Sequence, residues 1–203
     1  PVSTSGGTGP PAHEASIPKT PAMIRHLIVG NRSKKAIHPK NKGTDEPLGG
    51  GLGVLLALAA QGDQPRFGGG IKDTLINIKA TGEFVVNIVD ETLAEAMNAT
   101  AGEYPHGVSE FEQAGLAIAP SVDVQPPRVS AARIALESKL HQIVEVKDSA
   151  SVMVLGRIVR YHIHPDVFRA DAGTVDAAAL QPVARLGGAE YAVLGDVFSL
   201  RGP

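Results

Sequence analysis

Two long segments of alternating residues constrain the fold more than any other feature of this sequence. Residues 135–146 and 152–164 alternate apolar and polar side chains with a period of two, as half-buried β-strands do. The short polar stretch 147–150 connects them, so an antiparallel hairpin is the simplest topology. Such strands favour a barrel, because closing the sheet removes edges with unpaired backbone groups.

One helix and one further strand are predicted upstream of this hairpin. Asp73 and Thr74 precede an apolar run that ends before Gly82, which predicts a helix with an N-terminal cap and a glycine stop. The β-branched residues of 83–89 then predict a buried strand.

Two more short helices are predicted between that strand and the hairpin. Residues 92–100 predict the first, with Thr92 as its N-cap and Glu95 completing a capping box. Ser109 begins the second, which Gly115 ends. The expected fold class is therefore mainly β with short helices.

The first 70 residues differ in character from the rest. They are rich in Gly, Pro, Ser and Lys, with Phe67 as their one aromatic residue, and they predict loops. Residues 22–30 and 52–60 are the segments that could form an element, the latter as a core helix or strand. The basic residues 31–42 predict a surface loop in preference to a phosphate site. The 203 residues fit a single domain, 1–203, in which residues 1–70 are poorly assigned.

Composition narrows the classes of function. Hydrophobic residues make up 43% and charged residues 20% of the chain, enough to bury a core. A net charge of -2 gives no basic field for a nucleic acid or an anionic membrane, so we expect a small-molecule ligand. The chain has no cysteine, which excludes disulfides, thiolate metal sites and cysteine nucleophiles. Because it shows neither a long apolar run nor a secretion signal, we expect a cytoplasmic protein.

A series of short motifs, in a fixed order, carries a resemblance to a known family. The motifs are Lys-Asp-Thr-Leu-Ile-Asn-Ile at 72–78, Thr-Gly-Glu-Phe-Val-Val-Asn at 81–87, Glu-Ala-Met-Asn-Ala-Thr at 95–100, Pro-His-Gly-Val-Ser-Glu-Phe at 105–111, Pro-Pro-Arg-Val at 126–129, and Arg-Leu-Gly-Gly at 185–188 followed by Tyr191. From Ile71 to Pro203 this order resembles the flavin reductase-like family of FMN-binding split barrels. Residues 1–70 do not match the family's motif.

The resemblance implies a split antiparallel β-barrel that binds FMN, or FAD in some members, at the interface of a homodimer. It implies a flavin reductase with NAD(P)H as co-substrate, and a monooxygenase as a candidate partner. Other members resemble flavoredoxin, an electron carrier. The carrier function therefore stays open as an alternative, as does a barrel that has lost its flavin site.

A flavin phosphate site is predicted where a glycine loop meets the first helix. Backbone N–H groups at a helix N-terminus and the Lys72 ammonium suit an anion. Residues 68–70 are glycines that let the backbone approach, and Thr74 adds a hydroxyl. The resemblance also places Lys72 and Thr74 beside the phosphate, with Asp73 in the same motif as the helix cap. An ordinary glycine loop before a capped helix is the alternative.

Two further groups are candidate flavin contacts. Asn98 and Ala99 end a helix where an amide can hydrogen-bond the edge of a flavin ring. Arg185 supplies a guanidinium for phosphate, and Tyr191 a ring for stacking or hydrogen bonding. A polar helix end and a structural turn are the plain alternatives for these two places.

Two histidines are candidates for binding the nicotinamide. His162 and His164 lie two apart on a predicted strand and so share one face. The resemblance makes His162 the first choice and His164 the second, with an ordinary half-exposed strand histidine as the alternative. A third ligand of suitable spacing is missing from the neighbouring sequence, so we expect no metal. Hydride transfer from NAD(P)H to a flavin needs no acid or nucleophile from the protein, so we assign no catalytic residue.

Overall fold

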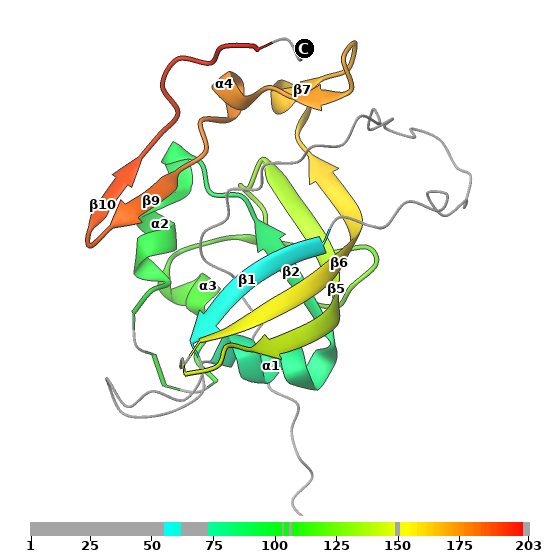
Figure 1. Ribbon diagram of the computed structural model, residues 1–203, viewed down its shortest axis with the longest axis vertical. Helices are drawn as coiled ribbons and strands as arrows, with labels where there is room; N and C mark the ends of the chain where they lie inside the picture. The colour runs from blue at the N-terminus through cyan, green and yellow to red at the C-terminus, as the bar shows by residue number, and fades with distance from the viewer. Residues whose placement is uncertain (1–54, 62–72, 103, 106, 149–150, 201–203) are drawn as a thin grey trace, which may run out of the picture.

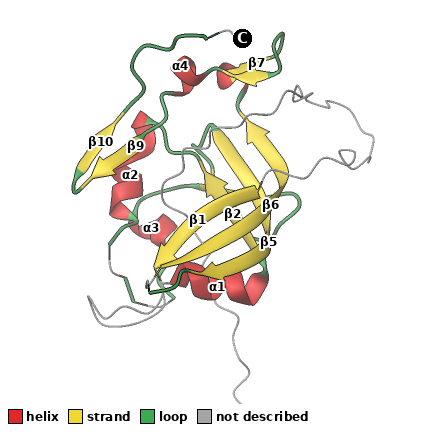
Figure 2. Cartoon of the chain, in the orientation of Figure 1, coloured by secondary structure: helices red, strands yellow, loops and turns green. Residues whose placement is uncertain are grey.

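The computed structural model describes residues 55–61, 73–102, 104–105, 107–148 and 151–200. They form a mainly β fold in which short helices lie beside one curved antiparallel sheet (Figures 1 and 2). The sheet has the strand order β1-β6-β5-β2. Its strands are β1 (Leu55–Gln61), β2 (Glu83–Asn87), β5 (Ile134–Glu145) and β6 (Ser151–Ile163). The expected fold class, mainly β with short helices, is confirmed.

The predicted hairpin is the largest element of the sheet. β5 and β6 pair antiparallel along almost their whole length, from Ile134 opposite Ile163 to Glu145 opposite Val152. The register shifts twice, which lets the pair twist strongly enough to curl around a core. Both strands match the predicted segments to within one residue at each end.

The strand β1 lies in the N-terminal part, for which the sequence predicts mainly loops. It pairs antiparallel with β6, so the expectation of an element near residues 52–60 is confirmed as a strand. The predictions for residues 22–30 and 31–42 lie outside the described residues. No helix among the described residues has the length and apolar character needed to span a bilayer.

One face of the sheet carries the main hydrophobic core. Phe84 is fully buried there, directly over Gly156 of β6. A Cβ at position 156 would lie 2.2 Å from Cζ of Phe84, so only glycine allows this ring to sit against the strand. The buried members of this core are Leu75, Ile78, Phe84, Val86, Ile134, Leu136, Val154, Ile158, Val167 and Leu180.

The helix α1 (Asp73–Thr81) covers one end of this core, as predicted. Leu75 and Ile78 point into the core, and both are buried. Gly82 has φ of +69° and donates its N–H to the Ile78 carbonyl at 2.9 Å, which ends the helix. The following strand β2 is real but ends two residues before the predicted limit of 89.

The second predicted helix begins differently from the expectation. Residues 92–100 divide into a 3₁₀ turn η1 (Glu91–Leu93) and the helix α2 (Ala94–Ala99). The prediction that Thr92 caps this helix, with Glu95 in a capping box, is wrong, because the N-cap of α2 is Leu93, which makes no side-chain cap hydrogen bond. Asp90 caps the preceding η1, and its Oδ1 accepts the Thr92 N–H at 3.0 Å. The Thr92 hydroxyl also donates to that carboxylate.

The third helix leads into a segment that crosses the sheet. α3 (Glu110–Gln113) begins after Ser109 and is followed by Gly115 at φ of +64°, as predicted. Phe111 anchors it in a small core of its own. Beyond it, the short strands β3 (Ile118–Ala119) and β4 (Arg128–Val129) pair with each other.

The C-terminal part consists of short elements at the end of the molecule farthest from α1 (Figure 1). They are η2 (Pro165–Val167), β7 (Phe168–Arg169), β8 (Thr174–Val175), α4 (Ala177–Leu180), β9 (Ala184–Gly187) and β10 (Glu190–Ala192). The segment 193–200 has no regular structure. Exposed apolar side chains collect in this part: Leu186, Val193, Leu194, Val197, Phe198 and Leu200.

Candidate functional site

The second face of the sheet, which we call the anchoring face, carries polar side chains that hold one crossing segment. Glu83, Asn87 and Glu137 lie on it, since residues two apart on β2 share a face and Glu137 pairs with Val85. They accept backbone N–H groups from residues 118–129, which we call the crossing segment. This segment has little β pairing of its own, so the carboxylates and the amide satisfy backbone donors that would otherwise lack partners.

Glu137 is the centre of this arrangement and is fully buried. Its Oε1 accepts the Val122 N–H at 2.8 Å, and its Oε2 accepts the Asp123 N–H at 2.6 Å. Its Oε1 also contacts Nε2 of His162. The carboxylate thus ties together β5, β6 and the crossing segment.

The surroundings of Glu137 favour its ionised form. Burial acts to raise the pKa of this carboxyl, but the hydrogen bonds from His162 and from the Asp123 and Val122 amides act in the opposite direction and leave the pKa lowered. A carboxylate that accepts several N–H groups is stabilised as the anion. At neutral pH Glu137 therefore accepts hydrogen bonds and donates none.

Two more anchors flank Glu137. The Gln125 N–H donates to Glu83 at 2.9 Å, and the Val129 N–H donates to the Asn87 side-chain oxygen at 2.9 Å. Together with Glu137 they fix the crossing segment along its length.

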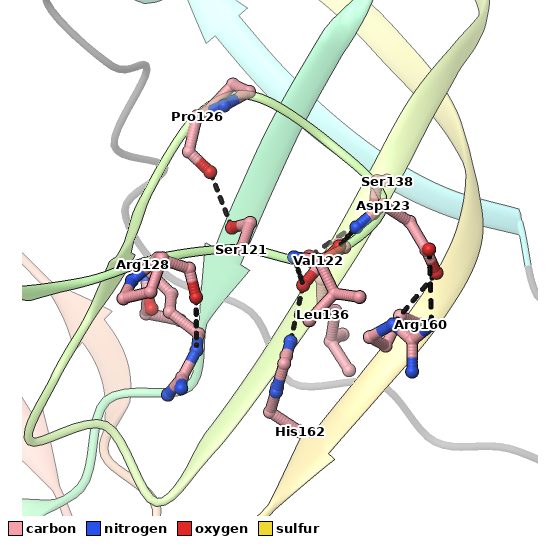
Figure 3. Close-up of polar contacts among 12 residues, drawn as sticks. Ser121, Val122, Asp123, Pro126, Arg128, Leu136, Ser138, Arg160 and His162 are labelled. Carbon is pink, nitrogen blue, oxygen red and sulfur yellow. Dashed lines mark hydrogen bonds and ion pairs between the residues drawn. The ribbon is translucent and has the colours of Figure 1, made fainter. Parts of the chain in front are cut away.

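An ion pair and an internal hydrogen bond complete the crossing segment (Figure 3). The Arg160 guanidinium on β6 donates to both carboxylate oxygens of Asp123, at 2.8 and 3.1 Å. The Ser121 hydroxyl donates to the Pro126 carbonyl at 2.6 Å. The ion pair is half exposed, so it contributes less to stability than the buried anchors.

His162 lies on the anchoring face beside Glu137. The register places it opposite Ala135, two residues from Glu137, so the two side chains share this face. Its side chain is 21% exposed, with Nε2 directed at the buried carboxylate (Figure 3). Of the two nicotinamide candidates, His162 is the one that contacts a buried carboxylate, Glu137, while part of its side chain stays exposed to solvent.

His164 has a different setting from that expected. It lies one residue beyond the end of β6 and forms the N-cap of η2. Its Nδ1 accepts the Asp166 N–H at 3.4 Å, and the ring is more than half exposed. The strand therefore presents one of the two histidines, His162.

A second buried carboxylate, Asp90, lies at the start of η1. It is fully buried, and its Oδ2 accepts from Nε of Arg133 at 2.7 Å. The other guanidinium nitrogens of Arg133 donate to the carbonyls of Ala179 and Leu180 at the end of α4. This network joins the β2 end, the turn before β5 and the C-terminal helix.

The predicted phosphate site is described from Asp73 onward, because Lys72 and the glycines before it lie outside the described residues. Asp73 and Thr74 are both half-buried in the first turn of α1. This helix has 9 residues, with Asp73 as the acidic residue of its first turn.

The other candidate flavin contacts lie on two further elements. Asn98 and Ala99 are exposed at the end of α2, where the Tyr104 hydroxyl donates to the Ala99 carbonyl at 2.9 Å. Arg185 and Tyr191 face each other across the β9–β10 hairpin, with the guanidinium carbon 5.7 Å from the ring centroid. Arg185 also donates to the Gly188 carbonyl at 2.8 Å.

The candidate residues of one chain are spread over the molecule. α1 lies at one end and the β9–β10 hairpin lies well away from it (Figure 1). The helix α1 and the β9–β10 hairpin of one chain therefore lie on different parts of the molecule.

A family model for the flavin reductase-like domain matches residues 51–178. That match covers more than half of the 203 residues. The chain belongs to the flavin reductase-like family.

Similar proteins agree with this membership. An uncharacterized protein of Halalkalibacterium halodurans is 40% identical over 136 residues, which cover 65% of this chain and 64% of the relative. Nitrilotriacetate monooxygenase component B from Bacillus cereus is 36% identical, with a TM-score of 0.64 over 72% of this chain and 71% of that chain. A flavin reductase with a split barrel domain from Shewanella frigidimarina, named as putative, is 26% identical, with a TM-score of 0.64 over 73% and 71%. The chain spans somewhat less than two thirds of the length of the curated relatives that it matches first.

Membership in the flavin reductase-like family confirms the expected split-barrel fold. The family match includes Lys72, Asp73, Thr74, the α2 end and both histidines, whereas Arg185 and Tyr191 lie beyond its last residue, 178. The roles of all these residues remain predictions.

Sequence reasoning missed Glu137 and Asp90. Glu137 stands at a polar position of an alternating strand, and such positions normally face solvent. It is buried because the crossing segment covers it. That segment has no periodic pattern from which its position over the sheet could be predicted. Asp90 had a usable signal, since an Asp two residues before a Thr at a helix start is a common N-cap arrangement.

Proposed function

We propose that this chain is a flavin reductase that transfers a hydride from NAD(P)H to FMN, with FAD as the alternative flavin. Support comes from the flavin reductase-like match and from the similarity to a monooxygenase component B and to a split-barrel protein named as a flavin reductase. The observation that carries the proposal is the half-buried His162, held by a buried carboxylate and open to solvent on the anchoring face.

The start of α1 fits the phosphate of a flavin. Helix N-terminal N–H groups and the Thr74 hydroxyl are donors for an anion, and Lys72 adds a positive charge next in sequence. The Asp73 carboxylate repels an anion, so we assign it to the start of the helix and assign the phosphate contacts to Lys72 and Thr74. When bound, the flavin accepts the hydride, and the protein supplies binding and orientation.

We assign three further roles to side chains of this chain. His162 binds the nicotinamide, with His164 as the weaker candidate because its ring already contacts Asp166. Asn98 hydrogen-bonds the ring edge of the flavin. Arg185 and Tyr191 contact the flavin held by a second copy of the chain, because they lie far from α1 of their own copy.

A homodimer is part of this proposal. The apolar side chains that are exposed on the hairpin and on 193–200 form a surface of the kind that protein partners cover. Covering it with a second copy would bring the hairpin to the partner's flavin site. Light scattering coupled to size exclusion tests this, since a monomeric mass at micromolar concentration would contradict it.

The direct test of the proposed activity is NADH and NADPH oxidation by the purified chain with added FMN or FAD, preceded by an absorbance scan for bound flavin. Turnover would establish a reductase. Bound flavin without turnover would favour the alternative, an electron carrier that resembles flavoredoxin. Neither signal would mean that the barrel has lost its flavin site.

Variants at α1 separate these outcomes further. Lys72→Ala and Thr74→Val should each weaken flavin binding about tenfold, as expected for the loss of one charge-assisted hydrogen bond. The matched control is Lys79→Ala in the last turn of the same helix, which should leave flavin affinity unchanged. Equal affinity in all variants would remove the phosphate assignment. A monooxygenase partner and a cytoplasmic location, where NAD(P)H is available, complete the proposal.

A further inference from the structure

We propose that Glu137 is a positioning residue that holds His162 with Nε2–H directed inward, so that Nδ1 is the acceptor offered to a nicotinamide carboxamide. The orientation of the His162 ring follows from contacts within the chain and does not depend on the activity. Its role toward nicotinamide rests on the proposed function. Neither the family match nor the similar proteins assign a role to Glu137.

The hydrogen bonds around Glu137 place a proton on Nε2 of His162. Two of its partners are backbone N–H groups, which can only donate, so the carboxylate must accept from Val122 and Asp123. An ionised carboxylate has no proton to give to a histidine. Nε2 of His162 therefore carries the hydrogen in this contact.

The other ring nitrogen is left for a ligand. In the neutral imidazole with Nε2–H, Nδ1 is a pure acceptor. Among the described residues, the structure shows no hydrogen bond at Nδ1 of His162, and the side chain is 21% exposed. An acceptor at the edge of a protein surface suits a ligand with a hydrogen-bond donor, such as the N–H group of a primary carboxamide.

Glu137 is suited to this role because it cannot easily turn away. It is fully buried, and its two amide partners belong to a segment that Glu83 and Asn87 also hold. The pattern of a carboxylate that orients a histidine through one nitrogen while the other acts is general in protein sites.

The first test is the tautomer of His162 in the full chain, read from the ¹⁵N shifts and ring couplings of ¹⁵N-histidine NMR at neutral pH. The His162→Gln spectrum identifies the signal among the 7 histidines. We expect the Nε2–H form in the wild type, a mixture of tautomers in Glu137→Gln, and the wild-type pattern in Asp123→Asn. The control removes the exposed ion pair with Arg160 but keeps the Asp123 N–H. An Nδ1–H form in the wild type would overturn the proposal without any variant.

The second test is a double-mutant cycle on NAD(P)H oxidation. Glu137→Gln should raise KM for NAD(P)H about fivefold to tenfold, the effect of one misplaced hydrogen bond, with kcat and flavin affinity nearly unchanged. In the His162→Gln background the same change should alter KM less than about twofold, because Glu137 then has no ring to orient. Additive effects in the cycle would overturn the positioning role.

A nicotinamide analogue sharpens the chemical claim. The reduced 3-acetylpyridine cofactor has a methyl ketone and no N–H group at this place. Wild type should bind it about fivefold more weakly than NADH, and Glu137→Gln should lose this preference. A wild type that accepts both equally would overturn the carboxamide contact. If the wild type oxidised no NAD(P)H, the proposed function would fail, while the tautomer measurement would still decide the role of Glu137.

Discussion

The chain contains two buried carboxylates, Asp90 and Glu137, that use the same device with different partners. Both are fully buried, both accept backbone N–H groups, and both contact the side-chain nitrogen of a basic residue on another element. The partner of Asp90 is Arg133, whose planar guanidinium carries donors on three nitrogens. The partner of Glu137 is His162, whose imidazole has two ring nitrogens.

The difference lies in what the partner has left to offer. The other two guanidinium nitrogens of Arg133 donate to the carbonyls of Ala179 and Leu180, so all three nitrogens bind within the fold. We call this a closed network, and it holds α4 in place. His162 contacts Glu137 through Nε2, and the described residues make no hydrogen bond to its Nδ1, so we call it an open partner. A buried carboxylate with a closed partner stabilises a fold, whereas one with an open partner can prepare a side chain for a ligand.

The largest effect is expected from Arg133→Met. This change leaves the Asp90 carboxylate buried without its counter-charge and removes the donors to α4, so it should lower the free energy of unfolding by about 3 kcal/mol or more. Urea denaturation followed by circular dichroism measures the loss. A loss no greater than that of an exposed ion pair would show that the Asp90 network is not the closed structural element described above.

Glu137→Gln should lower the free energy of unfolding by about 2 kcal/mol, because a neutral amide cannot accept from every donor that hydrogen-bonds the carboxylate. Its pH dependence sharpens the comparison. The pKa of Glu137 is lowered in the folded chain, so its contribution is present above the ordinary pKa of about 4.3 and is lost as pH falls through the lower folded pKa.

The unfolding free energy of the wild type should therefore fall more steeply than that of Glu137→Gln between about pH 5 and pH 3. Urea titrations across this range provide the measurement. Parallel curves for the two proteins would mean that Glu137 is not held as an ionised acceptor.

His162→Gln should have a small effect on stability, less than about 1 kcal/mol, because the glutamine amide can still donate to Glu137. His162→Leu removes that donor and should cost about 1 kcal/mol. Both variants should raise KM for NAD(P)H more than KM for flavin, which separates the ligand role from the structural one. An equal rise in both constants would point to a folding defect.

The smallest effect is expected from Arg160→Met, which repeats the Arg133→Met substitution at an exposed pair. Its partner Asp123 and the guanidinium are both more than one third exposed, so the loss should stay below about 1 kcal/mol and shrink further in high salt. Thermal unfolding at low and high salt measures it. A loss that matched Arg133→Met would remove the distinction between the two networks.

The sequence predicted the elements well where local rules decide them. The β5–β6 hairpin follows from its alternation, and α1 from its cap and from Gly82. It failed where distant residues decide. The burial of Glu137 depends on the crossing segment, and the cap at Asp90 prevailed over Thr92 because a carboxylate is the stronger acceptor.

Of the candidate site, His162 was identified through the family resemblance, since alternation alone leaves it an ordinary strand residue. Its buried anchor could not be predicted, because a charged residue in an alternating strand is normally assigned to solvent. The spread of Thr74, Asn98 and Arg185 over separate elements likewise depends on tertiary structure. Only the fold shows that α1 and the hairpin of one chain lie apart.

The central claim is that this split barrel passes a hydride from NAD(P)H to a bound flavin with His162 holding the nicotinamide. The most direct measurement is anaerobic mixing of flavin-loaded protein with NADH or NADPH, followed by the loss of the flavin absorbance in wild type and in His162→Leu. The account predicts rapid bleaching whose rate saturates with NAD(P)H in the wild type, and saturation at about tenfold higher concentration in the variant. Flavin that stays oxidised in the wild type, or equal saturation in both proteins, would contradict it.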